Sequence, residues 1–284
     1  MRLAWSAEKL WPMSFATPNR RGFLREAALV AAAMLAYFLV RNLTVGSAEE
    51  AFANAERIVD VEQWAHIGWE EDVQASIAGR DFPVMLANWI YIWGHWPVII
   101  GTAIALHRYR PERYHLLRNA LFVSGAIGFL FFALFPVAPP RLLDLGLVDT
   151  VTEQSQAYRA LQPPGLTNQY AAVPSLHVGW NALVGIVLLT TTTHLAVRVF
   201  AVASPLAMGF AVIATANHFV VDVAAGLLVV LVGLAAAYAI ERRGPVTTLR
   251  PSGSAARVEA LRRRAAPVPR RTPRRQPPRR PVGS

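Results

Sequence analysis

Long apolar blocks dominate the pattern of hydrophobic and polar positions along the chain. The blocks are about 20 residues long, which is the length that an α-helix needs to cross roughly 30 Å of hydrocarbon. Four of them each predict one membrane span: Leu24 to Val45, Val84 to Leu106, Leu117 to Phe135 and Pro174 to Leu195. The first block also fits a signal peptide, but its charged leader and its apolar stretch are both longer than usual for one.

A fifth apolar block, residues 196–240, is about twice as long as one span requires. The polar cluster "TANHFVVD" lies near its middle, so the chain is expected to turn back at about Thr215 to His218. The fifth block therefore supplies two spans, and the predicted number of membrane spans is six. The sequence therefore predicts an all-α fold, a polytopic membrane helical bundle with six transmembrane helices over residues 24–243, preceded by a cytoplasmic segment of residues 1–23.

The composition agrees with this class. Hydrophobic residues make up 54% of the 284 positions and charged residues only 16%, as is typical of an integral membrane protein. There is no cysteine, which excludes a disulfide framework and a thiolate metal site.

The net charge of +10 comes from the C-terminal end. Residues 242–284 hold 13 Arg and one Glu, or +12, which leaves −2 for the rest of the chain. Residues 244–284 have no apolar periodicity and many prolines, so we expect a disordered Arg/Pro-rich cytoplasmic tail. No aromatic residue interleaves the arginines, which favours anionic lipid headgroups over nucleic acid as the partner of the tail. A solvated tail with only a topogenic role is an equal alternative.

The distribution of basic residues predicts the orientation, because short cytoplasmic loops collect Lys and Arg. Residues 46–83 carry nine acids against Arg57 and Arg80 and are therefore expected outside, where Trp64 and Trp69 indicate an interfacial helix. The segment before the first span and the loop between the second and third spans are expected inside, because they carry Arg2, Lys9, Arg20, Arg21, Arg25, Arg108, Arg110, Arg113 and Arg118. With six spans, both termini of this multi-pass cell-membrane protein are predicted to be cytoplasmic.

In this orientation, ionisable residues from separate segments fall on the extracytoplasmic side: Arg141 after the third span, His177 at the start of the fourth, and His218 with Asp222 at the last turn. Arg41, near the outer end of the first span, is a further candidate. Taken singly, each has a structural explanation, such as snorkelling to the interface or packing between helices. Their coincidence at one depth favours a functional site, because ionisable groups inside a membrane are costly.

The chemistry that suits these residues is phosphoryl transfer. His218 and Asp222 are four residues apart on one helix face, so the carboxylate can orient the ring and leave its other nitrogen free as a nucleophile. His177 can serve as general acid toward the leaving oxygen and then as general base toward the incoming hydroxyl.

The stretch "VPSLH" reads as a helix start that binds phosphate. Pro174 is expected in the first helical turn, where free amides point at an anion, and Ser175 adds a hydroxyl. Arg141 would neutralise the phosphoryl oxygens.

Two stretches resemble motifs of a known family, the type 2 phosphatidic acid phosphatase superfamily of membrane phosphatases and phosphotransferases. They are "PSLH" at 174–177, similar to Pro-Ser-Gly-His, and "HFVVD" at 218–222, similar to the end of the family's third motif. No Lys or following Pro accompanies Arg141, and Ala211 and Val212 stand where the family has Ser-Arg. These departures are similar to the branch that contains inositol phosphorylceramide synthase, where a "PPR"-like helix end also occurs. Arg41 is the candidate substitute for the missing Arg.

The leading functional hypothesis is an integral membrane enzyme that transfers a phosphoryl-headgroup unit, such as phosphoinositol, from a phospholipid to an alcohol through a phosphohistidine intermediate. One alternative is a lipid phosphate phosphatase that hydrolyses a phosphomonoester or pyrophosphate lipid. A second is a non-catalytic lipid-binding or flipping protein. No cofactor or metal is expected, since no cluster offers three ligands. His95, in "GHWP", is interpreted as a structural histidine.

Overall fold

The computed structural model describes residues 24–33, 35, 47–154 and 168–242. Within these ranges the regular elements are α-helices and one 3-10 turn, without a strand, so the predicted all-α class is confirmed. Arg41, residues 1–23, most of the first predicted span and the tail of residues 244–284 lie outside the described residues.

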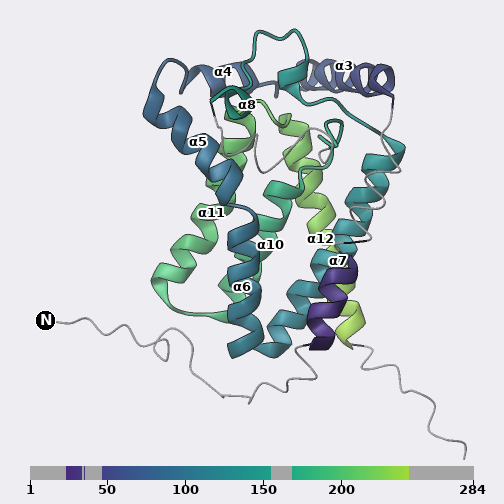
Figure 1. Ribbon diagram of the computed structural model, residues 1–284, viewed down its shortest axis with the longest axis vertical. Helices are drawn as coiled ribbons and strands as arrows, with labels where there is room; N and C mark the ends of the chain where they lie inside the picture. The colour runs from purple at the N-terminus through teal and green to yellow at the C-terminus, as the bar shows by residue number, and fades with distance from the viewer. Residues whose placement is uncertain (1–23, 34, 36–46, 155–167, 243–284) are drawn as a thin grey trace, which may run out of the picture. The chain divides into compact units, whose positions relative to one another are not determined.

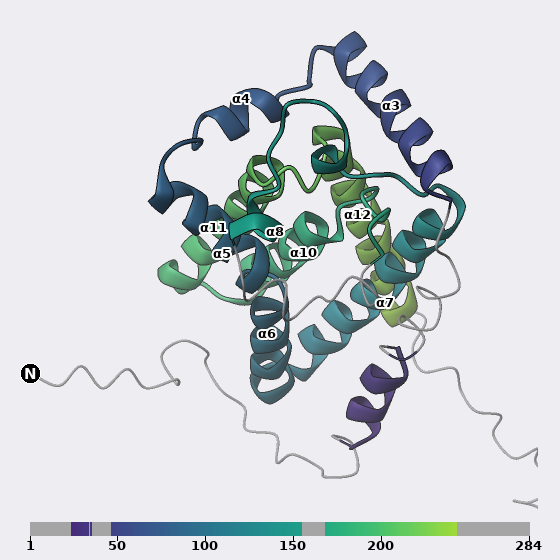
Figure 2. The ribbon, with the colours of Figure 1, turned by 45° about the horizontal axis from the view of Figure 1, so that its top comes forward.

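Helices α3 and α4 run across one end of a bundle formed by the longer helices (Figures 1 and 2). Helix α10 packs against α6, α7, α11 and α12, and α12 also packs against α3 and α7. Residues 24–33 are helical as well. The labelled elements are α3 (Ala48–Ala65), α4 (Glu70–Ala75), α5 (Asp81–Trp93), α6 (Trp96–Tyr109), α7 (Pro111–Leu134), η1 (Pro140–Leu142), α8 (Thr150–Gln154), α10 (Leu176–Thr191), α11 (Leu195–Ala214) and α12 (Val220–Arg242).

Three of the described helices, α7, α11 and α12, are long and apolar enough to cross a membrane. The bent pair α5 and α6 is a fourth candidate if it counts as one span. Helix α10 has 16 residues and is about 24 Å long, which is short of the roughly 30 Å of a bilayer core. The described residues thus supply three or four spans, and the predicted count of six is not confirmed. The predicted turn in the last apolar block is confirmed, because α11 ends at Ala214 and α12 begins at Val220.

The second predicted span, residues 84–106, is not one continuous helix. Helix α5 ends at Trp93, α6 begins at Trp96, and the two are bent by 46°. The N–H of Gly94 closes α5 on the carbonyl of Ile90 at 2.8 Å. Pro97 then occupies the first turn of α6, where its missing N–H cannot continue the ladder of α5. Hydropathy does not reveal the break, because apolar residues continue on both sides of it.

Two glycines allow the beginnings of α10 and α12 to meet. A Cβ atom at Gly179 would lie 2.7 Å from the carbonyl oxygen of Gly226, and a Cβ atom at Gly226 would collide with the backbone of Ser175. At the same place the N–H of Ser175 donates to the carbonyl oxygen of Asp222 at 2.9 Å. Because any side chain at these glycines would push the helices apart, they place "PSLH" directly against "HFVVD".

The segment between α7 and α8 is fixed to the same end of the bundle by buried amide side chains. Asn54 of α3 donates from Nδ2 to the carbonyl oxygen of Pro136 at 2.9 Å. Gln74 of α4 donates to the carbonyl oxygen of Val148 at 3.0 Å and accepts from the N–H of Val148 at 2.7 Å. These contacts satisfy loop backbone groups that would otherwise be buried without partners.

Candidate active site

His218 and Asp222 contact each other, but they do not lie on one helix face as predicted, because His218 precedes α12 by two residues and Asp222 lies in the first turn of α12. His218 Nδ1 is 3.2 Å from Asp222 Oδ2 and 2.8 Å from the carbonyl oxygen of Ala172. A carbonyl oxygen can only accept, so the ring carries its proton on Nδ1 and leaves the lone pair of Nε2 available. Asp222 Oδ2 also accepts from the N–H of Phe219 at 2.9 Å, which fixes the carboxylate relative to the turn.

The environment of His218 keeps its imidazole uncharged. The side chain is buried. Burial lowers the pKa of His218 to about 3, the hydrogen bond with Ala172 opposes this shift, and the positive charge of Arg141 adds to it. At neutral pH the ring is therefore neutral, as a nitrogen nucleophile must be.

His177, in the first turn of α10, lies next to His218. The two ring centroids are 6.0 Å apart, and the ring planes are inclined by 55°. The structure corrects one detail of the predicted helix start, because α10 begins at Leu176 with Ser175 as its N-cap. Pro174 therefore precedes the helix and is not in its first turn; it follows a cis Val173–Pro174 peptide bond. The reason is that the N–H of Ser175 already bonds to α12.

Ser175 and Asp222 each present a buried oxygen without a partner. The side chain of Ser175 is fully buried, it makes no capping bond to its own helix, and its Oγ has no hydrogen-bond partner. Oδ1 of Asp222 is likewise unpartnered. Buried polar atoms without partners are uncommon and each calls for an explanation, such as a ligand that completes the site.

Arg141 is held beside His218 by two anchors. Its Nη1 donates to Oδ1 of Asn217 at 2.7 Å, and its Nε lies 3.1 Å from Oδ2 of Asp149. The backbone N–H of Arg141 donates to the carbonyl oxygen of Ala216 at 3.0 Å. The guanidinium is thereby fixed at the turn that carries His218.

Asn217 and Asp149 were not assigned to the site from the sequence. Asn217 stands in the polar "TANH" cluster, which offered a signal, whereas Asp149 lies in a loop without a motif. Thr150, the next residue after Asp149, exchanges two hydrogen bonds with Asn88 of α5, at 3.0 Å and 2.9 Å. Asp149 is therefore presented from a fixed segment.

His95, which the sequence analysis interpreted as a structural histidine, contacts His177. The two ring centroids are 4.4 Å apart, and His95 also stacks on Trp180 with the planes inclined by 8°. Asn181 donates to the carbonyl oxygen of His177 at 2.9 Å and faces Nδ1 of His95 at 3.4 Å. The bend between α5 and α6 is what places His95 here.

Two further acidic residues were missed. Glu62 of α3 and Glu70 of α4 are buried against the start of α12. They accept from the backbone N–H groups of Val221 and Val220 at 2.7 Å and 2.8 Å, respectively. Both belonged to the acidic set that indicated an external loop, and nothing in their spacing distinguishes them from exposed neighbours.

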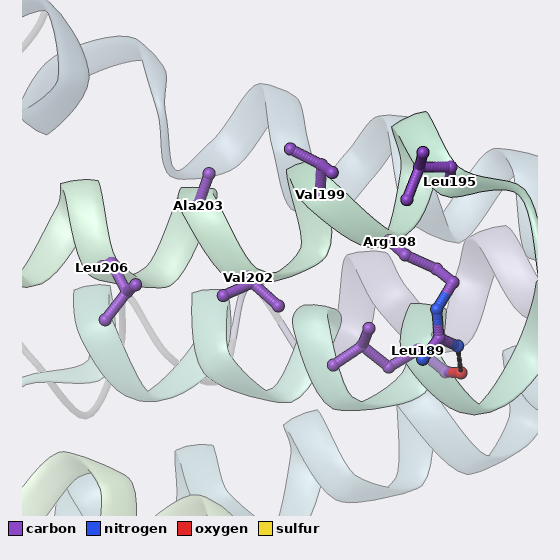
Figure 3. A pocket seen from close by; sticks show the side chains of 7 residues that line it. All are labelled: Leu189, Leu195, Arg198, Val199, Val202, Ala203 and Leu206. Carbon is purple, nitrogen blue, oxygen red and sulfur yellow. Dashed lines mark hydrogen bonds between the residues drawn. The ribbon is translucent and has the colours of Figure 1, made fainter.

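Among the described residues no group of three or more His, Cys, Asp or Glu side chains is arranged to hold a metal ion. An apolar hollow of about 430 Å³ lies on α10 and α11, far from His177 along α10 (Figure 3). Its one charged residue, Arg198, donates from Nη1 to the carbonyl oxygens of Leu189 and Thr192 at 2.9 Å and 3.3 Å. The hollow offers no acid, base or nucleophile and is not part of the candidate site.

His177, His218 and Asp222 lie within the part of the chain that matches a family model. Residues 56–236 match the model of the PAP2 superfamily. The chain belongs to this superfamily. It is a membrane protein and an enzyme of the lipid phosphoester phosphatase or phosphotransferase kind, which sets the non-catalytic alternative aside.

No curated protein sequence matches this chain. Its fold is similar to the crystal structure of LpxE from Aquifex aeolicus, with 18% identity, 57% of this chain and 88% of that chain covered, and a TM-score of 0.45.

Proposed function

We propose that this enzyme transfers a phosphoryl-headgroup unit, such as phosphoinositol, from a phospholipid to an alcohol through a phosphohistidine on His218. The observation that carries the proposal is the geometry of His218, whose Nδ1 is occupied by Ala172 and Asp222 while Nε2 keeps its lone pair. A ring held in this tautomer is ready to attack phosphorus without first losing a proton.

In the first half-reaction, Nε2 of His218 attacks phosphorus, the bond from phosphorus to the departing alcohol oxygen breaks, and protonated His177 gives its proton to that oxygen. The released lipid alcohol is then a diacylglycerol if the donor is a glycerophospholipid. In the second half-reaction, neutral His177 takes the proton of the acceptor hydroxyl, whose oxygen attacks phosphorus and releases His218. His177 ends protonated, so the cycle is balanced.

The remaining site residues are assigned to charge stabilisation. The guanidinium of Arg141 would neutralise the non-bridging phosphoryl oxygens, because its anchors Asn217 and Asp149 hold it beside the nucleophile. The unpartnered Oγ of Ser175 and the first amides of α10 would complete the phosphate site. Arg41 is a further candidate for phosphate binding on sequence grounds.

Transfer in preference to hydrolysis is supported by the walls of the site. Ala138, Ala172, Val173 and Phe219 form a buried apolar cluster next to His218. An enclosed apolar wall excludes water and favours an acceptor that brings its own apolar surface. The Ser-Arg positions of the phosphatase pattern are also structurally altered, since Ala211 and Val212 are fully buried in another apolar cluster.

We also propose that the site faces the extracytoplasmic side and that both termini are cytoplasmic, on the basis of the arginine distribution. The basic tail would then contact anionic headgroups of the inner leaflet, remote from the site.

The test is the partition of a labelled headgroup. Full-length protein in micelles is given phosphatidylinositol labelled in the inositol ring, with and without a panel of lipid alcohols, and the label is followed into lipid and into water. Transfer predicts a new labelled lipid that depends on the acceptor and disappears in His218→Ala. If phosphatidic acid is hydrolysed well while no phosphodiester lipid is consumed with any acceptor, the transferase proposal is wrong and the phosphatase alternative replaces it.

A further inference from the structure

The first turn of α12 is capped by three carboxyl groups in succession. The N–H of Phe219 donates to Asp222, that of Val220 to Glu70 and that of Val221 to Glu62, at 2.9, 2.8 and 2.7 Å. Asp222 is close in the chain to Phe219, whose N–H it accepts, as is usual for a capping residue. Glu62 and Glu70 instead come from α3 and α4, 159 and 150 residues away in the chain.

We propose that Glu62 and Glu70 are positioning residues of the active site, which fix the first turn of α12 and thereby hold His218 and Asp222 in register with His177. This inference rests on the proposed role of His218 and deepens it, because it names what keeps the nucleophile in place. Neither glutamate contacts the reacting atoms in this scheme; both act through the backbone of the turn.

The burial of the two side chains supports this role. Glu62 is 2% exposed and Glu70 is 7% exposed, whereas Glu71 and Asp60 on the same two helices are exposed. Buried carboxyl groups are costly unless they are hydrogen-bonded or paired. The ion pairs of the described residues include neither of them, so the amides at the positive end of α12 are what stabilises them.

The geometry also links two separate parts of the fold. Residues 218–222 follow the end of α11 and carry the nucleophile and its partner, while α3 and α4 lie across the end of the bundle (Figure 1). Without Glu62 and Glu70, the amides of Val220 and Val221 would have no carboxyl acceptor, and the turn would depend on Asp222 alone. Asp222 would then have to cap the helix and orient His218 without support.

The pair also makes the turn sensitive to pH. Burial raises the pKa of Glu62 to about 8, the N–H of Val221 opposes this rise, and the nearby Glu70 and Asp222 add to it. Below that pH Glu62 is protonated and hydrogen-bonds to Glu70. A raised carboxyl pKa contributes stability that is complete below the unfolded value of 4.5 and is lost as the pH rises through about 8. Above it, Glu62 gains a negative charge at a turn where carboxyl groups from α3, α4 and α12 lie close together.

The experiment uses the full-length chain in micelles and compares Glu62→Ala, Glu62→Gln, Glu70→Ala and Glu70→Gln with the exposed controls Glu71→Ala and Asp60→Ala. Turnover is measured separately with phosphatidic acid and with phosphatidylinositol plus a lipid alcohol. Hydrogen exchange of the segment around residues 219–222 reports the turn directly and needs no substrate. The pH profile is recorded from pH 5 to 9.5.

Loss of a helix cap predicts that each Ala variant lowers kcat by about tenfold, with KM changed by less than about twofold, and speeds exchange of the Val220 or Val221 amide by about tenfold. Gln keeps an acceptor oxygen, so it should restore most of kcat. The wild type is expected to lose activity above about pH 8, and Glu62→Gln should remove this decline, because Gln does not ionise. The two controls should match the wild type.

Ala variants with unchanged exchange at residues 219–222 and unchanged kcat would overturn the inference. So would a Gln variant whose pH profile equals that of the wild type. Failure of the transferase proposal gives a different result, because phosphatidic acid hydrolysis would then respond to the variants while phosphatidylinositol is never consumed.

Discussion

The substitution Asp222→Asn tests whether the contact with His218 serves catalysis. Oδ2 of Asp222 accepts from both Nδ1 of His218 and the N–H of Phe219, while Oδ1 has no partner. If the Asn oxygen takes the place of Oδ2, both bonds remain but the negative charge is lost, and the amide NH2 is buried without an acceptor. If the NH2 takes that place, it meets two donors, and His218 must move its proton to Nε2. Either orientation impairs the nucleophile.

The size of the effect follows from the charge that develops on His218. When Nε2 bonds to phosphorus, the ring becomes cationic 3.2 Å from Oδ2 of Asp222. At an effective dielectric constant near 20, two unit charges at that distance attract by about 5 kcal/mol. Loss of this attraction in the transition state corresponds to a decrease of about 10³ to 10⁴ in kcat. KM should change much less, because the ring is neutral before the reaction.

The assay is rapid quenching with a ³²P-labelled donor lipid, which measures the phosphoenzyme burst and the steady-state rate together. Asp222→Asn should show a burst slowed by the factor above, and His218→Ala should show none. Size-exclusion profiles and thermal unfolding in the same detergent establish that each variant is folded. A folded Asp222→Asn protein within about threefold of the wild-type rate would mean that the pair only packs α12 against its neighbours.

Three further outcomes are expected. Arg141→Lys should lower kcat/KM by about 10- to 100-fold although the charge is kept, because one ammonium cannot reproduce the fork that contacts Asn217 and Asp149; equal kcat/KM values would exclude a planar contact with phosphate. Gly226→Ala should lower the thermal midpoint and the activity together, because its Cβ would collide with the backbone of Ser175, whereas Gly209→Ala, with open space around its Cβ, should leave both unchanged. Single cysteines at the exposed positions Ser47 and Thr152 should react with an impermeant thiol reagent in intact cells, and one at Ser252 should not; the reverse pattern would refute the proposed orientation.

Local sequence patterns predicted the parts of the site that lie close together in the chain. The spacing of His218 and Asp222 predicted a contact on one helix face; the structure has the contact at 3.2 Å, although His218 lies in the turn just before the helix. The third span was predicted to end at Phe135, directly before Pro136, and the structure ends α7 at Leu134. In each case the physical cause acts over a few residues, through helix periodicity or a missing N–H.

The sequence could not predict the partners that come from distant segments. Glu62 and Glu70 look like solvent-exposed acids of an external loop until α3 and α4 are seen to cover the start of α12. His95 looked like a structural histidine because hydropathy predicted one continuous span, whereas the chain breaks at Gly94 and Pro97 and His95 contacts His177. Long-range contacts of this kind leave no periodic signal in the sequence. Each residue is compatible with its local backbone structure whether its side chain is exposed or contacts the site.

The capping of α12 also determines where a phosphate group can lie. Two helices begin at the site, and the positive end of either could attract an anion. The amides of Phe219, Val220 and Val221 already donate to carboxyl groups and are therefore not free to bind phosphate on the α12 side. Helix α10, in contrast, has no side-chain cap at Ser175, and Arg141 is fixed next to His218 by Asn217. The phosphate is therefore expected between α10 and Arg141, so that it approaches Nε2 of His218, while Asp222 contacts Nδ1 on the other side of the ring and holds it in its reactive tautomer.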